Sequence, residues 1–264
     1  MTPEVVAVLA ALGPAHRRES LAALRQVLAA ALPSAPARIA IVDNQLPGDV
    51  EIVVDPLTTL LSGDNRAREF SAWERGLDWL ASLGALSKAR AVILANDTLH
   101  RSYGDTWLRG FTERRTETAL AKGGLLGWVD AYPRPIELFG LPLVDWMRTS
   151  LLVTRPDTLA RLRPLTLPLD DSALFSDDPA APFRLPSPLS ARYRDYLLAW
   201  VTGDSSRTPE FPFTWHSAAP LTQATLASHT GKLRSIVCEH YLSARAHAAN
   251  VPFFDIAVRS KKGP

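Results

Sequence analysis

The residues of this sequence that are best suited to chemistry are polar side chains that follow its short apolar runs. Four runs are followed by an aspartate, and these aspartates are Asp43, Asp55, Asp97 and Asp130. Carboxylates bind divalent cations and accept protons, so several of them at one sheet edge would form a polar site. Each aspartate taken alone is more typical of a turn or a helix cap. Their number therefore favours a polar site at one edge of a sheet.

The strongest local signal is the segment VILANDTL at residues 92–99. A buried strand would deliver Asn96 and Asp97 to the edge of the sheet. A carboxylate there can hold a divalent cation, Mn²⁺ or Mg²⁺, that bridges the two phosphates of a nucleotide sugar. Mg²⁺ usually takes only one or two carboxylates besides phosphate oxygens. We therefore expect Asp97 to be a metal ligand.

A second polar loop, SGDNRAREF at residues 62–70, lies one strand earlier and leads directly into a helix-like segment. The helix that follows is amphipathic, and its inner face is predicted to carry Phe70, Trp73, Leu77 and Leu80. The loop contains Asp64 and Asn65, which could meet a nucleotide through side-chain and backbone groups. This loop is therefore a second candidate for nucleotide binding.

These polar residues need a scaffold, and the first half of the sequence alternates between strand-like and helix-like segments. Continuous apolar runs, typical of strands buried on both faces, cover residues 4–10, 38–42, 50–54 and 90–95. Later strands are predicted at 123–129 and 149–154, and helices at 18–32, near 105–121 and after Pro156. This order predicts an α/β fold with a mostly parallel sheet and helices on both faces. In such sheets ligands bind beyond the carboxyl ends of the strands.

The second half of the sequence predicts an irregular segment followed by helices. Residues 164–188 hold six of the 21 prolines and four aspartates, which is typical of a linker or a long loop. Helices are predicted near 189–202 and 222–249. The sequence thus divides into a core at 1–165, a Pro- and Asp-rich loop or linker at 166–188, and a C-terminal helical extension at 189–264 that packs on the core.

The order of these motifs resembles the nucleotide-binding half of a GT-A glycosyltransferase over residues 4–165. A strand that ends in VDN, a polar loop with its helix, and a strand that ends in NDT are similar to glycosyltransferase family 2. They are more similar to the rhamnan-synthesis F-like proteins, which carry Asn–Asp–Ser or Asn–Asp–Thr where family 2 carries Asp-x-Asp. The resemblance implies a GT-A-like, Rossmann-like core.

The resemblance also implies roles for particular residues. Asp43 takes the place of the acidic residue that contacts the nucleoside, while Asp64 and Asn65 lie in the loop that faces the base. Asp97 takes the metal- and diphosphate-binding position, and Asn96 beside it is a further nucleotide-sugar-binding residue. The NDT motif offers one carboxylate where Asp-x-Asp offers two, so this chain departs from family 2 at the metal site.

The catalytic base of an inverting transfer has several candidates in this sequence. Such a base must lie within hydrogen-bond reach of the acceptor hydroxyl. Asp130 is the first choice because it follows an apolar run at the expected edge, and Asp145 is the second because desolvation beside Trp146 could raise its pKa. The pair Asp170–Asp171 is a third. Arg148 could pair with the departing diphosphate, or could form a structural pair with Asp145.

Aromatic and histidine side chains each have a structural alternative. Four aromatic residues cluster within 19 positions, namely Trp128, Tyr132, Phe139 and Trp146. Their faces could stack on sugar rings, but a sheet–helix core is built from the same residues. His240 and His247 lie seven apart on one predicted helix, where surface or packing roles are more typical than metal binding.

Composition and motifs exclude several classes of protein. The sequence contains no GxGxxG, GxxxxGK[ST], HExxH or GxSxG motif, which argues against common dehydrogenases, P-loop enzymes, zincins and hydrolases. The single cysteine, Cys238, is compatible with a reducing compartment. A net charge of +2 does not indicate a nucleic-acid partner. No run of 18 apolar residues indicates a transmembrane helix, and the N-terminus lacks the pattern of a secretory signal.

The charge distribution bears on whether the protein contacts a membrane surface. Residues 181–264 hold 10 Lys or Arg against 5 Asp or Glu, whereas residues 1–180 hold 19 against 22. A basic C-terminal part could attract the protein to an anionic membrane face. Alternatively, the helix at 222–249 packs its apolar face back on the sheet domain and the charges are only solvated. We expect a cytoplasmic protein with peripheral contact at the inner membrane face.

These inferences favour a glycosyltransferase that moves a sugar from a nucleotide-diphosphate donor to a growing surface polysaccharide or a lipid-linked glycan, and inversion is the expected outcome. The alternative is a catalytically silent GT-A-like protein that binds glycan or scaffolds a synthesis complex. A metal-dependent phosphohydrolase is the weakest possibility, because the sequence has no clear DxDx[TV] nucleophile motif.

Overall fold

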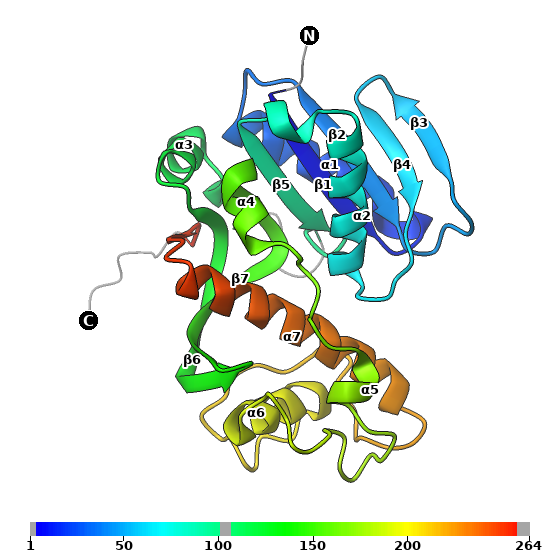
Figure 1. Cartoon of the computed structure of the whole chain (residues 1–264), viewed down its shortest axis with the longest axis vertical. Helices are drawn as coiled ribbons and strands as arrows, with labels where there is room; N and C mark the ends of the chain where they lie inside the picture. The colour runs from blue at the N-terminus through cyan, green and yellow to red at the C-terminus, as the bar shows by residue number, and fades with distance from the viewer. Residues whose placement is uncertain (1–3, 101–106, 258–264) are drawn as a thin grey trace. The chain divides into compact units, whose positions relative to one another are not determined.

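The computed structural model describes residues 4–100 and 107–257 and has an α/β fold. Within this part of the chain, eight strands form one mixed sheet in the order β3-β4-β2-β1-β5-β7-β6-β8 (Figure 1). The strands are β1 (Val5–Ala11), β2 (Ala37–Asp43), β3 (Glu51–Asp55), β4 (Thr58–Ser62), β5 (Ala91–Asn96), β6 (Leu125–Leu138), β7 (Leu141–Thr154) and β8 (Phe253–Asp255). The predicted fold class, a mostly parallel sheet with helices, is confirmed.

The centre of the sheet is parallel, as its uninterrupted apolar strands require. Strand β1 is buried at every position and pairs in parallel with β2 on one side and β5 on the other. Strand β4 continues the parallel set beyond β2, while β7 runs antiparallel to β5. The register places Ala11 beside Asp43 and Ala10 beside Asn96, so the polar strand ends meet at one edge.

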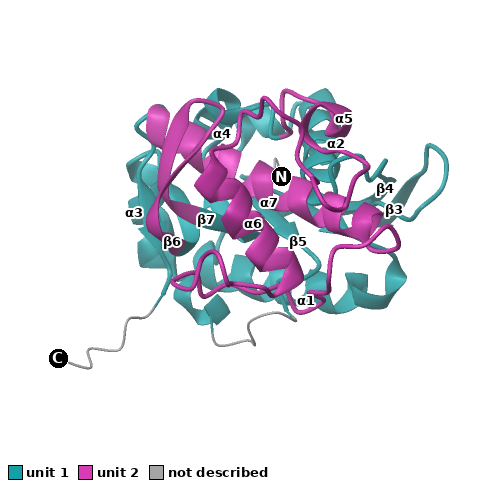
Figure 2. Cartoon of the chain, turned by 90° about the horizontal axis from the view of Figure 1, so that it is seen from below, with its two compact units in different colours: residues 1–129, 147–165, 249–264 teal, residues 130–146, 166–248 magenta. Residues whose placement is uncertain are grey.

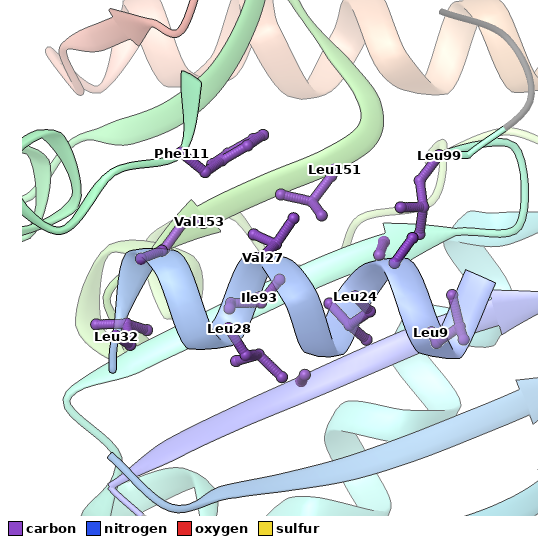
Figure 3. Packing of buried hydrophobic residues seen from close by; sticks show 14 of the residues in the cluster. Leu9, Leu24, Val27, Leu28, Leu32, Ile93, Leu99, Phe111, Leu151 and Val153 are labelled. Atoms are coloured by element: carbon purple, nitrogen blue, oxygen red, sulfur yellow. The ribbon is translucent and has the colours of Figure 1, made fainter. Parts of the chain in front are cut away.

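Helices cover both faces of this parallel region. The chain forms α1 (Pro14–Ala31), α2 (Glu69–Ser82), α3 (Glu113–Ala121), α4 (Pro156–Leu162), α5 (Asp171–Leu174), α6 (Ala191–Thr202) and α7 (Leu226–Ala248), with short 3₁₀ turns η1 (Leu86–Lys88) and η2 (Trp107–Gly110). Figure 3 shows Leu24 and Val27 of α1 packed over Leu9 and Ile93. On the other face, a Cβ at Gly76 of α2 would overlap Val8, so α2 lies close to β1.

The inner face predicted for the helix after the polar loop is confirmed. Phe70, Trp73, Leu77 and Leu80 are all fully buried on α2. The indole Nε1 of Trp73 donates to the carbonyl oxygen of Ala95, at 2.8 Å. This bond ties α2 to the residue of β5 that immediately precedes Asn96, and so helps to fix the polar end of that strand.

The prediction of a buried strand at residues 50–54 was wrong. Strand β3 is the exposed edge of the sheet and runs antiparallel to β4, with the Val53 side chain 71% exposed. The fully buried strand at this side of the sheet is β4, whose TTLLS sequence is less apolar. Because β3 is reversed, Asp55 lies beside Thr58 at the start of β4, at the edge opposite to Asp43.

The predicted strand at residues 123–129 does not end before Asp130. Strand β6 continues to Leu138, with Tyr132, Ile136 and Leu138 buried along the extra length. Strand β7 begins at Leu141 rather than at Thr149. Asp130 is therefore a residue within a long strand and does not mark the end of a strand. The helix predicted near 105–121 is observed from Glu113, and its first residues, 105 and 106, lie outside the described residues.

The chain forms two compact units, which divide it differently from the predicted domains. Unit 1 comprises residues 1–129, 147–165 and 249–264, and unit 2 comprises residues 130–146 and 166–248 (Figure 2). Residues 166–188, expected as a linker, belong to unit 2, where Phe175 pairs with Phe183 in a short bridge. The last described strand, β8, returns to unit 1 and pairs with β6.

Unit 2 has its own core around a fully buried histidine. The hydroxyl oxygens of Tyr193 and Tyr132 lie 2.6 Å and 3.1 Å from Nδ1 of His240. The aromatic rings around this group are those of Trp146, Tyr196, Trp200, Phe211 and Phe213. Tyr132 and Trp146, considered as sugar-stacking residues, are therefore core residues of unit 2.

Helix α7 contributes its apolar side to the same unit. Leu233, Ile236, Val237 and Leu242 are buried within it. The apolar side of α7 is thus part of the core of unit 2. The basic residues Arg259, Lys261 and Lys262 of the predicted membrane-facing tail lie outside the described residues.

Candidate functional site

The turn between β1 and α1 is the centre of the candidate site in unit 1. Its two successive N–H groups donate to carboxylates that come from the two flanking strands. Leu12 N–H donates to Asp97 Oδ2 at 2.7 Å, and Gly13 N–H donates to Asp43 Oδ1 at 2.8 Å. From β1 the chain moves outward to β2 and β4, and then returns to the other side of β1 as β5. This reversal is a topological switch point, which is where open α/β sheets bind ligands.

Asp43 is an almost fully buried carboxylate, with only 2% of its side chain exposed. Besides Gly13, it accepts from the N–H of Gln45 at 3.0 Å and pairs with Arg17 on α1 at 2.9 Å. A buried carboxylate needs such partners because its desolvation would otherwise be costly. Asp43 therefore holds the β1–α1 turn and the start of α1 against the end of β2.

The turn itself requires glycine. Gly13 has φ of 83°, in the left-handed region that residues with a Cβ rarely adopt. A Cβ at this position would also overlap the Gln45 side-chain oxygen. With Pro14 fixing the first helical residue, the sequence GP thus shapes a tight entry into α1 directly above the strand ends.

Asn96 and Asp97 occupy the end of β5 in different ways. Asn96 is nearly buried, donates to the carbonyl oxygen of Thr149 at 3.2 Å, and accepts from the N–H of Thr98 at 3.0 Å. It therefore shapes the turn and ties β5 to β7. Asp97 uses Oδ2 for Leu12, while its Oδ1 makes no hydrogen bond with the described residues. That oxygen is the atom with which Asp97 can bind a ligand.

Two histidines lie beside Asp97, and the sequence analysis missed both. His16 is on the first turn of α1 and His100 follows β5, and their ring centroids are 6.2 Å apart. The buried hydroxyl of Ser20 lies 2.7 Å from the carbonyl oxygen of His16, 3.1 Å from that of Asp97, and 3.0 Å from Nδ1 of His100. Ser20 therefore joins the first turns of α1 to the turn that follows β5.

The polar loop after β4 is held by Asn44, which follows Asp43. Asn44 Oδ1 accepts from the N–H of Asn65 at 3.2 Å, and its Nδ2 donates to the carbonyl oxygen of Arg68 at 3.1 Å. Asp64 accepts from the backbone and guanidinium N–H groups of Arg66, at 3.0 Å and 2.5 Å. Although desolvation of Asp64 acts in the opposite direction, these bonds lower its pKa. The loop is thus pre-shaped next to the strand ends.

The candidate bases lie in unit 2 and differ from the sequence expectation. Asp145 is 39% exposed and its Oδ1 lies 2.7 Å from Nε2 of His247, so it is not the desolvated carboxylate that was predicted. Asp171 pairs with Arg234 of α7. Arg148, which belongs to unit 1, lies over the Trp128 ring, 5.1 Å from its centroid.

A divalent cation could be held at this edge only with help from a ligand. Within residues 4–100 and 107–257, no three His, Cys, Asp or Glu side chains are grouped as a metal site. Asp97 offers an oxygen that makes no hydrogen bond with the described part of the chain, and His100 follows it on the same turn. This donor set fits a cation that completes its coordination with phosphate oxygens and water.

Comparisons with known proteins add no relatives. No protein family matches the sequence, and no curated protein matches it either. Among the described residues, no helix is long and apolar enough to cross a membrane. The function must therefore be argued from the fold and the site alone.

Proposed function

We propose that this chain is a glycosyltransferase that binds a nucleotide-diphosphate sugar at the carboxyl edge of unit 1 and transfers the sugar to a glycan acceptor. The observation that carries the proposal is the contact between Leu12 N–H and Asp97 at the switch point of the sheet. It brings an acidic side chain, whose Oδ1 makes no hydrogen bond with the described residues, to the place where open α/β sheets bind nucleotides.

The donor-binding roles follow from the neighbours of that contact. Asp43 and the Asn44-anchored loop of Asp64 and Asn65 lie at the ends of β2 and β4, on the side of β1 away from Asp97. A nucleoside along these ends and a diphosphate at Asp97 would together span the edge. The chemistry matches that of the GT-A resemblance, in which these residues contact nucleoside, base and diphosphate.

A divalent cation, Mn²⁺ or Mg²⁺, would be held by Asp97 and by phosphate oxygens. When bound, such a cation neutralises charge on the departing diphosphate. Thr149, the neighbour of Arg148, accepts from Asn96, so the backbone at this point of β7 lies beside the end of β5. We assign Arg148 the task of stabilising the leaving group, with its guanidinium steadied by the Trp128 ring.

The base that deprotonates the acceptor hydroxyl is Asp130 or Asp145 in this proposal. Asp145 is exposed enough to meet an acceptor and is oriented by His247. A general base typically contributes about 10²–10⁴-fold to rate, so its loss lowers kcat more than affinity. Asp130→Asn and Asp145→Asn should each be assayed for transfer and for donor hydrolysis, and wild-type turnover by both would remove the inverting mechanism.

The deciding experiment measures donor binding by calorimetry. The full chain is titrated with UDP, GDP and dTDP, with and without Mn²⁺ or Mg²⁺. Asp97→Asn keeps an oxygen that can accept from Leu12 but removes the charge, so we expect at least about 10-fold weaker binding of the cation-supported diphosphate. The matched control is Asp55→Asn, because Asp55 also accepts a backbone N–H, from Leu57, but at the opposite edge of the sheet.

The outcomes of this experiment separate the alternatives. Equal loss in both variants, or no binding of any nucleoside diphosphate, would overturn the proposal. Binding without any donor hydrolysis or transfer would instead favour the catalytically silent binding or scaffold protein. One observation supports that second function: the carboxylate of Asp43 is occupied by Gly13, Gln45 and Arg17.

The proposal extends to a cytoplasmic protein that meets lipid-linked acceptors at the inner face of the membrane. Its support is the excess of basic residues after residue 180, each worth about 1 kcal/mol at an anionic surface. Co-sedimentation with phosphatidylglycerol vesicles should show binding at low salt that is lost at high salt. Failure to pellet at low salt would reject this membrane contact.

A further inference from the structure

The histidine at the end of β5 has one ring nitrogen engaged by a buried hydroxyl. Nδ1 of His100 lies 3.0 Å from Oγ of Ser20. That hydroxyl has a single hydrogen and lies between two carbonyl oxygens, at 2.7 Å and 3.1 Å. Carbonyl oxygens only accept, so the hydroxyl hydrogen goes to one of them and Ser20 must accept from His100. We therefore assign the ring hydrogen of neutral His100 to Nδ1.

This tautomer leaves the lone pair of His100 on Nε2. Histidines that bind metals almost always donate their other ring N–H to a fixed oxygen, which sets the ring orientation and the tautomer. Ser20 provides that oxygen here, and it is itself fully buried on α1. The His100 ring is only partly buried, so it is not a member of the apolar core.

Asp97 lies in the same turn as His100, and its backbone contacts the same Ser20 hydroxyl. The N–H of Leu99 donates to the carbonyl oxygen of Asn96 at 3.1 Å, which closes the turn that carries Asp97 and His100. The hydroxyl of Ser20 contacts the backbone of Asp97 and the ring of His100 together. Asp97 and His100 thus lie three residues apart on one turn that Ser20 holds at both positions.

We propose that His100, through Nε2, is a second protein ligand of the divalent cation that Asp97 holds with the diphosphate. This inference rests on the proposed function, because two protein ligands need phosphate oxygens to complete the shell. An imidazole ligand favours first-row transition metals over Mg²⁺. The site therefore prefers Mn²⁺ or Co²⁺ to Mg²⁺, and it binds the cation together with the diphosphate.

Two substitutions, one at His100 and one at Ser20, separate the proposed ligand from the residue that positions it. His100→Asn keeps an amide N–H in the position of Nδ1, so the bond to Ser20 is retained while the Nε2 atom is removed. Ser20→Ala keeps the Nε2 atom but removes its positioning bond, and alanine is tolerated on α1. His216→Asn, a substitution of a histidine in unit 2, controls for a general effect of losing an imidazole.

The test combines calorimetry with pulsed electron paramagnetic resonance on the full chain. Mn²⁺ with UDP, GDP or dTDP should give a nitrogen coupling to the metal in the wild type. The coupling should be absent in His100→Asn, present in His216→Asn and weakened in Ser20→Ala. Mn²⁺-supported affinity should fall about 10–100-fold in His100→Asn, the range known for disturbed metal sites. The preference for Mn²⁺ over Mg²⁺ should fall with it.

The possible failures are distinguishable. If the diphosphates bind but the wild type shows no nitrogen coupling, or His100→Asn binds as the wild type does, His100 is not a ligand and the proposed function still stands. Binding that is indifferent to cations overturns the inference in the same way. If no nucleoside diphosphate binds under any condition, the proposed function fails and this inference fails with it.

Discussion

At the carboxyl edge in unit 1, polar side chains bind backbone N–H groups and retain atoms that can meet a ligand, whereas in unit 2 the polar atoms around His240 bind one another. Asp97 accepts from Leu12 N–H with one oxygen, and its other oxygen has no hydrogen bond among residues 4–100 and 107–257. His240 has both tyrosine hydroxyls within reach of one nitrogen and is fully buried. A polar side chain that uses only some of its atoms in hydrogen bonds can also bind a ligand. A fully buried side chain such as His240 stabilises the fold.

The largest effect should come from removing the enclosed histidine. His240→Leu leaves the hydroxyls of Tyr132 and Tyr193 buried without this partner, and each such group costs about 1–3 kcal/mol. We expect the free energy of unfolding to fall by about 2–5 kcal/mol in urea titration. His240→Asn, which keeps an atom in the place of Nδ1, should lose less; an equal loss would contradict the role of the hydrogen bonds.

A smaller loss of stability is expected at the strand end of unit 1. Asp43→Asn keeps an acceptor for Gly13 but loses the charge that faces Arg17. We expect about 1–3 kcal/mol lower stability, the cost of leaving a buried or charged group without its partner. Asp97→Asn should change stability much less than this while weakening diphosphate binding. Similar stability losses at both positions would break the distinction between a structural and a ligand-binding carboxylate.

The pH dependence of stability should separate the regions further. Burial lowers the pKa of His240 well below its usual value, so the folded chain resists the proton that the unfolded chain accepts. Stability from this group is complete above about pH 6.5, the ordinary pKa of histidine. It is lost as the pH falls below that value, by at most about 1.4 kcal/mol per pH unit. Urea titrations between pH 7 and 5 should show this slope in the wild type and a reduced slope in His240→Leu.

The smallest effect is expected at the opposite edge of the sheet. Asp55 pairs with Arg25 at 2.6 Å, but both side chains are substantially exposed. Exposed pairs contribute about 0–1 kcal/mol, so Asp55→Asn should shift the urea midpoint only slightly and leave diphosphate binding unchanged. A clear loss of binding in this variant would show that the two edges are not chemically distinct.

The aspartate at residue 55 also shows what the sequence could and could not predict. Apolar runs correctly located β1, β2 and β5 because these strands are buried on both faces. The equally apolar run before Asp55 is an exposed edge, because a tight connection through Pro56 folds it back on β4. Apolarity alone does not distinguish a central strand from an edge strand, nor does it give the strand direction.

The site could be predicted only in part for a similar reason. Asp43, Asn96 and Asp97 were found because polar residues after buried strands mark the edge of a sheet. The residues that contact them have no comparable sequence pattern. Leu12 contributes only a backbone N–H, and Ser20 and Asp97 are 77 positions apart. Strand β6 was ended too early because Pro133 and Pro135 interrupt its pattern, although Tyr132 and Ile136 are buried.

The position of β8 in the sequence has a consequence for synthesis. This strand pairs with β6, and Ile256 donates to the carbonyl oxygen of Gly127 and accepts from Arg115. These partners leave the ribosome more than a hundred residues before Ile256 does, with the whole of unit 2 translated in between. Chains fold from the N-terminus as they emerge. The part of β6 in unit 1 that pairs with β8 therefore lacks this partner while unit 2 is being translated. A stalled or truncated product would leave the backbone groups of that edge unpaired.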